Sequence, residues 1–457
     1  MAELLDNDDP RFAFAALKEY AANSGALLRS HIEAFGFSGL ETVELDVNAA
    51  KGLGTLLASK RYAGLVLDRY YAHAAAKWLA THPTLGRLTE RAARSGAVDL
   101  LLREGDGTLT GDDLAQEILE DVLRTHAPNL TCRTAHILVD PPASDAAAAQ
   151  RERARSLRAS LRALGIETAL RVVDVNRPGI SLPEAPAAEP DLLLNASVFG
   201  TDAVFSDEPF FCERCRADIP SENVEPKSAG GQRLPEPRLL VETAARPLRS
   251  HLLIEARRRG IPAVSGFELE VARARAVIEA FLGRPLRNCV SATIERDIRL
   301  EAENIVLIGM PGCGKTTIGK ILAQRLMRRF VDVDELVAQH VGKFKARIYR
   351  EEGEAFFREK ETEAIRTLAL KTGLIISTGG GSCLRPVNRA LLGLNGRFIW
   401  LKRPLAKLAT RDRPIAIARG VAALYEERAP IYSALADRTI EVSSIDETVR
   451  AILGEHA

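Results

Sequence analysis

The sequence predicts an α/β protein of several domains, in which parallel sheets form the cores. An apolar run at residues 135–139 fits a strand, a helical pattern follows at 146–164, and residues 170–175 fit a second strand. This strand–helix–strand order is typical of a parallel sheet. The strand 305–308 likewise passes through glycines into a helical pattern at 317–327. A chain of 457 residues is also too long for one ordinary hydrophobic core, so two or three domains are expected.

The same patterns divide the rest of the chain. Residues 10–122 alternate helical patterns with short strands at 42–47 and 64–68, which predicts one α/β lobe. The periodicity is interrupted by a segment rich in proline and glycine, and it resumes with helices at 252–259 and 268–282. The expected organisation is a first lobe (1–128), a second lobe (129–285) with an inserted loop at about 206–238, a linker (286–303) and a last domain (304–457).

Composition and charge limit the partners that are expected. The 62 Lys and Arg residues nearly cancel the 61 Asp and Glu residues, so no overall field would attract nucleic acid or an anionic membrane. The chain has six cysteines and no recognisable signal segment, which indicates a reducing cytoplasm. No apolar run approaches the roughly 18 residues that a membrane-spanning helix needs. Protein partners are left open.

The most specific motif follows the strand 305–308, where residues 309–316 read Gly-Met-Pro-Gly-Cys-Gly-Lys-Thr. A glycine loop between a strand and a helix lets backbone N–H groups surround the phosphates of a nucleotide. Lys315 is expected to reach the β- and γ-phosphates, and Thr316 is expected to bind Mg²⁺. ATP and Mg²⁺ are therefore the predicted cofactors. The residues expected to contact ATP in this segment are Gly312, Cys313, Gly314, Lys315, Thr316 and Thr317.

A phosphate-binding loop does not identify the acceptor, so other residues must do so. Residues 330–334 read Phe-Val-Asp-Val-Asp, which puts Asp332 and Asp334 on alternate positions of an expected strand and therefore on one face. Two such carboxylates can take different roles in a site. Considered alone, the pattern fits a solvated strand end equally well.

Further motifs follow in a fixed order. They are Gly353-Glu354, Phe357-Arg358 with Glu361, Thr378 to Gly381, Arg413-Pro414-Ile415 and Arg428-Ala429-Pro430-Ile431-Tyr432. This ordered set, spread over residues 304–453 together with the phosphate-binding loop, resembles the shikimate kinase family. The resemblance implies phosphorylation of the 3-hydroxyl of shikimate by ATP, giving shikimate 3-phosphate and ADP in chorismate and aromatic amino acid biosynthesis.

The resemblance also implies roles for single residues. Shikimate would be held by Asp334, Arg358, Arg428 and the backbone of Gly380 and Gly381. Arginine forks suit the substrate carboxylate, and a carboxylate suits a ring hydroxyl. Asp334 would accept the proton of the 3-hydroxyl, with Lys315 and Arg413 as the other catalytic residues.

The resemblance to shikimate kinase also implies which residues contact the metal ion and which contact ATP from the lid. Asp332 would hold Mg²⁺ through water, beside Thr316. Arg413 would meet the ATP phosphates as a lid closes. The lid departs from the family because only four residues separate Leu408 from Arg413, so a nucleotide contact by Arg411 is left open.

Residues 11–285 resemble shikimate dehydrogenase in the order of several short motifs. These are Ser30-His31, Ser95-Gly96-Ala97-Val98-Asp99, Leu194-Asn195-Ala196-Ser197 and Arg246-Pro247-Leu248. The resemblance implies a two-lobed α/β region.

The dehydrogenase chemistry has no matching residues. Gly25 and Leu27 stand where the family carries serines, and Ala72 stands where it carries the catalytic lysine. The expected dinucleotide loop reads Asp140-Pro141-Pro142-Ala143, although proline lacks the N–H donor that a phosphate needs. For the catalytic aspartate only Asp112 or Asp113 is available. We therefore expect a dehydrogenase fold without its activity.

Alternatives remain at this point. The chain could be a sensor of pathway metabolites, or a phosphate-loop kinase acting on another small molecule such as gluconate. The intact phosphate and magnesium set favours an enzyme. Cys212 and Cys215 fit half of a zinc site, but no second pair follows them, which favours ordinary thiols.

Overall fold

The computed structural model describes residues 12–17, 26–35, 40–45, 50–128, 131–139, 145–172, 190–196, 237–286, 288–408 and 420–454. Within these residues the chain forms two compact units. The first unit takes in the described residues before 200, then 237–245 and Ala256–Ile298. The second takes in Arg246–Glu255 and the described residues from 299 onward.

The first unit contains a six-stranded mixed sheet in the order β2-β1-β3-β5-β6-β4. Its strands are β1 (Phe12–Leu17), β2 (Leu40–Leu45), β3 (Gly64–Leu67), β4 (Gly86–Leu88), β5 (Leu100–Arg103) and β6 (Leu109–Asp112). Its helices are α2 (Ala26–Ala34), α3 (Ala50–Ala58), the 3₁₀ helix η2 (Arg69–Tyr71), α4 (Ala72–Thr81), α5 (Glu90–Ser95) and α6 (Leu114–His126). β5 runs antiparallel to both β3 and β6, whereas the other pairs are parallel.

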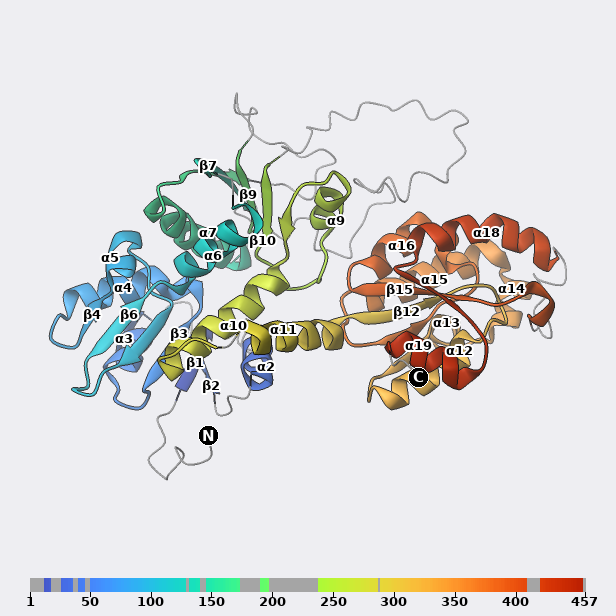
Figure 1. Ribbon diagram of the computed structural model, residues 1–457, viewed down its shortest axis with the longest axis horizontal. Coiled ribbons are helices and arrows are strands. Elements are labelled where there is room, and N and C mark those ends of the chain that lie inside the picture. The colour runs from blue at the N-terminus through green and yellow to red at the C-terminus, as the bar shows by residue number, and fades with distance from the viewer. Residues whose placement is uncertain are drawn as a thin grey trace. The chain divides into compact units, whose positions relative to one another are not determined.

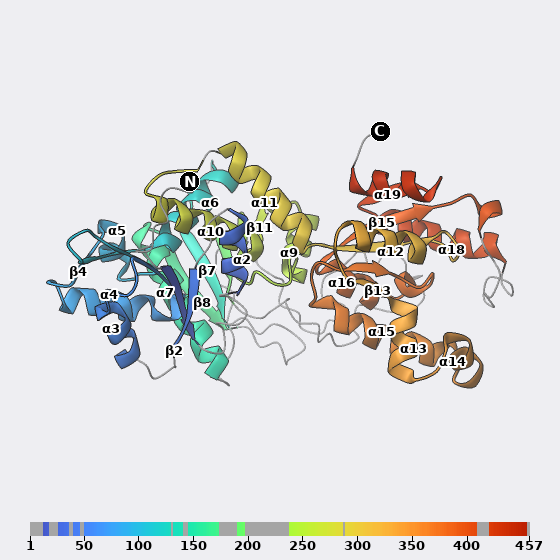
Figure 2. The same cartoon turned by 90° about the horizontal axis from the view of Figure 1, so that it is seen from below.

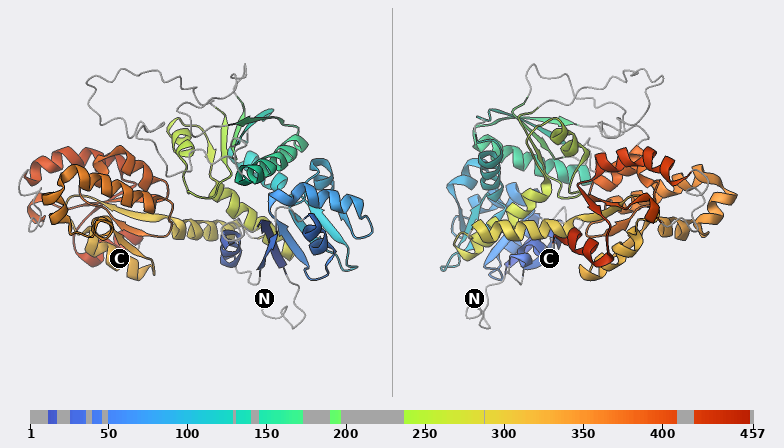
Figure 3. Two further views of the ribbon diagram at one scale, coloured as in Figure 1. Left: turned by 180° about the vertical axis from the view of Figure 1, so that it is seen from behind. Right: turned by 45° about the vertical axis from the view of Figure 1, so that its right-hand side comes forward.

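The same unit contains a second sheet, which is parallel throughout and has the order β11-β10-β9-β7-β8. Its strands are β7 (Thr134–Val139), β8 (Glu167–Val172), β9 (Leu192–Asn195), β10 (Leu239–Glu242) and β11 (Ala263–Val264). In sequence, α7 (Asp145–Ala163) lies between β7 and β8, and α9 (His251–Arg258) lies between β10 and β11, while α10 (Gly266–Leu282) and α11 (Asn288–Ala302) follow β11. Helix α7 packs on β7 and β8 and also contacts η2 and α5, so it lies between the two sheets of this unit (Figure 3).

The second unit is built on a parallel five-stranded sheet in the order β13-β14-β12-β15-β16. Its strands are β12 (Asn304–Ile308), β13 (Phe330–Asp332), β14 (Ile375–Ser377), β15 (Gly396–Lys402) and β16 (Arg438–Glu441). The other elements are α12 (Lys315–Arg325), α13 (Val333–Val341), α14 (Lys345–Glu351), α15 (Gly353–Ala369), η3 (Ser382–Leu384), α16 (Pro386–Gly393), η4 (Leu405–Lys407), α18 (Val421–Leu435) and α19 (Ile445–Leu453).

Helices cover both faces of this sheet. Figures 1 and 2 show α12 and α19 together on one face, while α15 and α16 lie on the other. The central strand β12 is buried along its whole length, as expected for a parallel strand covered on both sides. The carboxyl ends of β12, β13 and β14 meet at one edge of the sheet, where ligands of parallel α/β sheets bind.

The second unit includes a segment from far upstream, Arg246–Glu255. The backbone N–H of Leu248 donates to Asn395 Oδ1 at 2.7 Å, and that of Arg249 donates to the Leu394 carbonyl at 2.9 Å. The Arg249 guanidinium also donates to the Gly396 carbonyl at 2.6 Å and pairs with Glu303 at 3.2 Å. These residues join the segment to the amino end of β15.

The predicted fold class is confirmed: the chain is α/β, and two of the three sheets among the described residues are wholly parallel. The stretch 286–303, expected to join two domains, contains the helix α11. One local expectation differs from the structure. The strand expected at 330–334 ends at Asp332, because Asp332 caps a helix that begins at Val333. The expected loop at 206–238, with Cys212 and Cys215, lies almost wholly outside the described residues. No helix in the described ranges is long and apolar enough to cross a membrane.

Candidate active site

The glycine loop after β12 has a backbone conformation that residues with side chains rarely adopt. Gly309, Gly312 and Gly314 have φ angles of 141°, 85° and 106°, which L-residues with a Cβ rarely adopt. A Cβ on Gly309 would also lie only 2.6 Å from the Leu401 carbonyl oxygen. Helix α12 begins directly after the loop, at Lys315, so its N-terminal N–H groups point toward the loop.

Lys315 is held on the loop backbone. Its ammonium donates to the carbonyls of Gly309 at 2.8 Å and Met310 at 3.0 Å, and it lies 3.9 Å from Cys313 Sγ. The side chain of Cys313 is fully buried, so its part in phosphate binding would come from the backbone. Thr317 is exposed on the first turn of α12.

The two aspartates take different positions. Asp332 is the N-cap of α13 and accepts from the N–H of Asp334 at 3.0 Å, while its other oxygen accepts from the Thr316 hydroxyl at 2.8 Å. Thr316 and Asp332, the two predicted metal residues, are therefore in direct contact. Asp334 lies in the first turn of α13, not on the strand as expected.

Asp334 faces the glycine turn that follows β14. A Cβ on Gly379 would lie 2.7 Å from Asp334 Oδ1, a buried oxygen that has no hydrogen-bond partner among the described residues. The second carboxylate oxygen, Oδ2, pairs with the ammonium of Lys345 at 2.6 Å. Lys345 belongs to none of the sequence motifs and was not among the predicted site residues.

The guanidinium of Arg358 lies against the same glycine turn. A Cβ on Gly381 would lie 2.4 Å from Arg358 Nη2. The same guanidinium pairs with Glu361 at 2.8 Å and with Glu354 at 3.1 Å. Burial disfavours the charged guanidinium, but Glu361, Tyr349 and Glu354 together outweigh that effect, so the pKa of Arg358 is raised and the group stays charged.

Arg428 approaches the turn from α18. Its side chain is buried, and a Cβ on Gly380 would lie 3.2 Å from its Nη1 atom. The hydroxyl of Tyr432, one turn further along α18, donates to the Gly380 carbonyl at 2.5 Å. Tyr432 thus fixes the turn that both arginines contact, a positioning role that the sequence analysis did not assign to it.

Glu361 links Arg358 to the end of the glycine turn. Its second oxygen accepts from the Ser382 hydroxyl at 2.5 Å, and Ser382 is fully buried. Nearby, burial raises the pKa of the Cys383 thiol to about 12, so this cysteine stays protonated at neutral pH.

The structure thus brings most of the predicted site residues to one place. Around the turn of Gly379, Gly380 and Gly381 it gathers Asp334, Arg358 and Arg428, with Pro311 of the phosphate-binding loop next to the turn. Arg411 and Arg413 lie outside the described residues.

The donor set fits a nucleotide and Mg²⁺. Three glycines with positive φ open the loop, a lysine follows them, and a hydroxyl in contact with a carboxylate offers the oxygen ligands that Mg²⁺ prefers. Chemically, the site pairs a phosphate-binding loop with two arginines and a carboxylate, which suits transfer of a phosphoryl group to a hydroxyl of an anionic acceptor.

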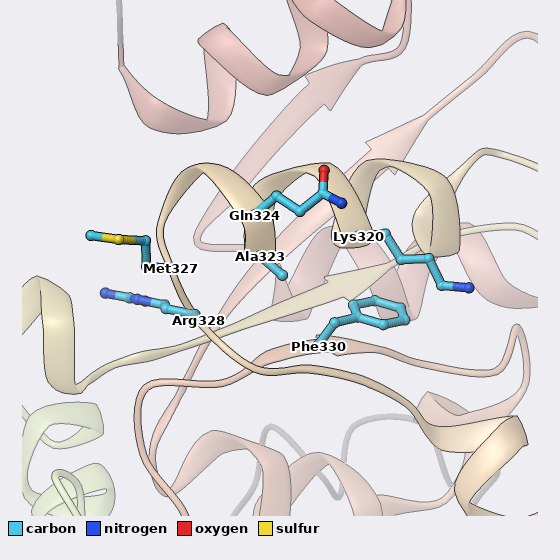
Figure 4. Close-up of a pocket in the computed structure, with 6 residues that line it drawn as sticks. All are labelled: Lys320, Ala323, Gln324, Met327, Arg328 and Phe330. Carbon is cyan, nitrogen blue, oxygen red and sulfur yellow. The ribbon is translucent and has the colours of Figure 1, made fainter.

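A separate hollow lies at the far end of α12, away from the phosphate-binding loop. Figure 4 shows its lining, which comes from α12 and the chain that follows it: Lys320, Ala323, Gln324, Met327, Arg328 and Phe330. None of these residues belongs to the predicted site.

In the first unit, both aspartates that are available for the catalytic aspartate of the dehydrogenase accept hydrogen bonds from arginines. Asp113 accepts from Arg69 at 2.6 Å and from the Ser160 hydroxyl at 2.6 Å. Asp112 accepts two hydrogen bonds from Arg91, at 3.1 and 2.6 Å. Ala72, at the position expected for lysine, is fully buried at the start of α4. The loop 140–143 and Gly25 lie outside the described residues.

Comparison with known proteins supports the kinase assignment for the second unit. Residues 311–455 match the family model described as shikimate kinase. The chain is 37% identical over 161 residues to the shikimate kinase of Neisseria meningitidis serogroup C (strain 053442), covering 33% of this chain and 93% of that protein. It is also similar to a solved shikimate kinase of Acinetobacter baumannii in complex with shikimate, with 31% identity, a TM-score of 0.32, and coverage of 34% of this chain and 94% of that chain.

The remainder of the chain is similar to solved structures of another kind. One is shikimate dehydrogenase 1 of Peptoclostridium difficile, with a TM-score of 0.41 and 16% identity, covering 64% of this chain and 99% of that chain.

Proposed function

Because this chain belongs to the shikimate kinase family, we propose that it transfers the γ-phosphoryl group of ATP to the 3-hydroxyl of shikimate. The products are shikimate 3-phosphate and ADP, and the reaction belongs to chorismate and aromatic amino acid biosynthesis. One observation carries the proposal: the phosphate-binding loop, Asp334 and two arginines meet at the turn of Gly379 to Gly381. A nucleotide and an anionic polyol therefore have adjacent binding groups.

Substrate binding follows from the charges at the turn. The planar forks of Arg358 and Arg428 would hold the carboxylate of shikimate, and the N–H groups of Gly380 and Gly381 would add hydrogen bonds. Glu361 fixes Arg358 from behind, so the fork is oriented before substrate arrives. This orientation reduces the entropy that binding must remove.

Phosphoryl transfer then needs a base and stabilisation of charge. Asp334 accepts the proton of the 3-hydroxyl while the oxygen of that hydroxyl forms a bond to the γ-phosphorus of ATP. The bond between the γ-phosphorus and the oxygen that bridges it to the β-phosphate breaks, which releases ADP. Lys315 stabilises charge on the β- and γ-phosphates, and Arg413 would do so from the lid. Thr316 and Asp332 would hold Mg²⁺, whose chemistry there is neutralisation of phosphate charge.

For the first unit we propose a non-catalytic role, as scaffold or regulator. The support is chemical: Ala72 cannot transfer a proton, and Asp112 and Asp113 are each engaged by an arginine. The proposed domain limits are 1–128, 129–285 and 304–457, joined at 286–303. We further propose that the protein works in the cytoplasm without nucleic acid or membrane partners.

A coupled assay for ADP formation tests the proposed function. The purified full-length chain is incubated with ATP and Mg²⁺, and with shikimate, gluconate or other hydroxy acids in parallel. We expect turnover with shikimate and background rates with the others. If gluconate is preferred, the acceptor assignment is wrong. If a folded sample binds ATP but turns over no acceptor, the sensor hypothesis is favoured.

A further inference from the structure

Lys345 is an unassigned cation inside the proposed acceptor site. It is the first residue of α14, a position where the helix dipole favours anions, so the lysine does not serve the helix. Its Nζ atom lies 2.6 Å from Asp334 Oδ2, the carboxylate proposed to act as the base. The side chains of Lys345 and Asp334 are 39% and 30% exposed, so the pair is accessible from solvent.

Aromatic rings hold the ammonium in place. Nζ lies 5.0 Å from the ring centroid of Phe357 and 5.9 Å from that of Tyr349, within the range of cation–π attraction. The two rings also contact each other, with centroids 4.7 Å apart. The guanidinium carbon of Arg358 lies 5.7 Å from the centroid of the same Phe357 ring, so Lys345 and the proposed carboxylate-binding residue share one aromatic neighbour.

The pair retains hydrogen-bonding capacity on both partners. An ammonium has three donors, and Lys345 makes one hydrogen bond, to Asp334, among the described residues. Asp334 Oδ1 is buried and accepts no hydrogen bond among the same residues. The pair therefore offers an acceptor and two donors side by side.

We propose that Lys345 is a specificity-determining residue, which donates to the acceptor hydroxyl adjacent to the one that Asp334 deprotonates. A vicinal diol matches the pair, since one hydroxyl donates to the carboxylate while its neighbour accepts from the ammonium. The inference rests on the proposed function, under which the deprotonated group is the 3-hydroxyl of shikimate. Its neighbour on the ring is the 4-hydroxyl, because position 2 carries a double bond.

The test compares Lys345→Met with Lys343→Met in the full-length chain. Methionine keeps the unbranched stem on Phe357 but removes the charge. Lys343 serves as the matched control because it pairs with Glu351 and Glu352, away from Asp334. A charged hydrogen bond contributes about 1.5–3 kcal/mol, so Lys345→Met should raise the Kd and KM for shikimate by about 10- to 100-fold. The kcat should change by less than about fivefold, since the contact forms in the ground state.

A second substrate, which lacks the 4-hydroxyl, distinguishes loss of the proposed contact to that hydroxyl from a general loss of substrate affinity. With 4-deoxyshikimate, wild type should lose affinity by a similar factor, whereas Lys345→Met should bind it about as well as it binds shikimate. Lys345→Arg keeps the charge and should recover part of the discrimination.

Calorimetric titration gives Kd independently of turnover, and circular dichroism checks that each variant is folded. An unchanged Kd in Lys345→Met, or a lower one, would overturn the proposal, and the lower value would identify Lys345 as a competitor for Asp334. Unchanged discrimination against 4-deoxyshikimate would also overturn it. Absence of shikimate turnover by wild type would instead contradict the proposed function.

Discussion

At the scale of single residues, two aspartates separated by one position do different work. Asp332 closes the N-terminus of α13 and contacts Thr316, so its negative charge lies beside the phosphate-binding loop. Asp334 lies two residues further along the chain and faces the glycine turn. One of its carboxylate oxygens has no hydrogen-bond partner among the described residues. The helix that starts between them places the proposed metal ligand and the proposed base at different points of the site.

Replacing Asp334 by Asn should lower kcat by about 100-fold or more, since a positioned general base typically contributes 10²- to 10⁴-fold. Steady-state ADP formation at saturating ATP and shikimate measures this loss. Glu335→Gln is the matched control, because Glu335 is exposed on the same helix and should leave kcat unchanged. Near-normal turnover of the Asn variant would remove Asp334 from the base role.

Replacing Arg358 by Lys should weaken shikimate binding more than it slows turnover. A lysine keeps the charge but loses the planar fork, and a lost charged hydrogen bond of about 1.5–3 kcal/mol corresponds to about 10- to 100-fold in KM. Arg347→Lys is a suitable control because Arg347 is an exposed partner of Glu351 on α14. Equal KM values for the Arg358→Lys variant and wild type would argue against a carboxylate contact.

The sequence could predict the site residues that belong to motifs, because each motif ties a residue type to a local backbone shape. Lys315, Thr316, Asp334 and Arg358 are of this kind. Lys345 could not be found in the same way, since it becomes informative only when the turn between α13 and α14 brings it to Asp334. Tyr432 was visible within a motif, but its contact with Gly380, 52 residues away, was not.

At the scale of elements, secondary structure was predicted correctly where the hydrophobic residues recur with a clear helical period, as in α12, and was missed where this period is weak, as in α11. The pattern at 317–327 predicts α12, which the structure places at Lys315–Arg325. The stretch 286–303 reads as a linker because Gly283 and Pro285 interrupt the preceding helix. It nevertheless contains α11, and Ile298 of that helix is buried. Burial of this kind depends on neighbours that the local pattern does not contain.

Helix α7 is tied to η2 by a buried ion pair, which gives a prediction for the first unit. Arg153 donates twice to Asp68, at 2.7 and 2.5 Å, and Asp68 is nearly fully buried. Arg153→Met would remove the ion-pair partner of that carboxylate and leave it only the N–H of Tyr70, so the free energy of unfolding of this unit should fall by about 3 kcal/mol. Chemical denaturation measures the change, with the exposed Arg155→Met on the same helix as control.

The effect should depend on pH in a defined direction. Burial disfavours the Asp68 carboxylate, but Arg153, the Tyr70 N–H and Arg273 together outweigh burial, so the pKa of Asp68 is lowered in the folded state. The pair therefore stabilises the fold above the unfolded pKa of about 3.9, and this contribution is lost as the pH falls through the lower folded value. The difference between Arg153→Met and wild type should shrink in acid. A difference that grows in acid would contradict the assignment.

At the scale of the whole molecule, the sequence predicted several α/β domains but not which segments belong together. Arg246–Glu255 lies within the expected second dehydrogenase-like lobe (129–285), but in the structure it belongs to the second unit. One of its contacts there is the hydrogen bond from Leu248 to Asn395, 147 residues away. A pairing of that sequence separation leaves no trace in local composition. The parallel order of the last sheet was predictable, because its strands alternate with helices.

The whole chain should neither oxidise shikimate nor bind NADP(H) tightly, although its first unit covers more than half of the sequence. Ala72 stands where the dehydrogenase family carries its catalytic lysine. The absence of this proton-transfer group alone should lower the rate of hydride transfer by about 10²- to 10⁴-fold. Fluorescence titration with NADPH, with an absorbance assay at high shikimate, measures both properties. Micromolar binding together with hydride transfer would show that the first unit is active.

Identification of the reaction products distinguishes a shikimate kinase from the other assignments of the second unit. Wild-type protein is incubated with ATP, Mg²⁺ and shikimate, and the products are identified by phosphorus and proton NMR, with parallel samples that lack shikimate or contain EDTA. We expect ADP together with a phosphate ester at the 3-hydroxyl of shikimate, and neither product in the two parallel samples. Folded protein that binds ATP but forms no shikimate ester, or that esterifies another hydroxyl, would contradict the assignment as a shikimate kinase.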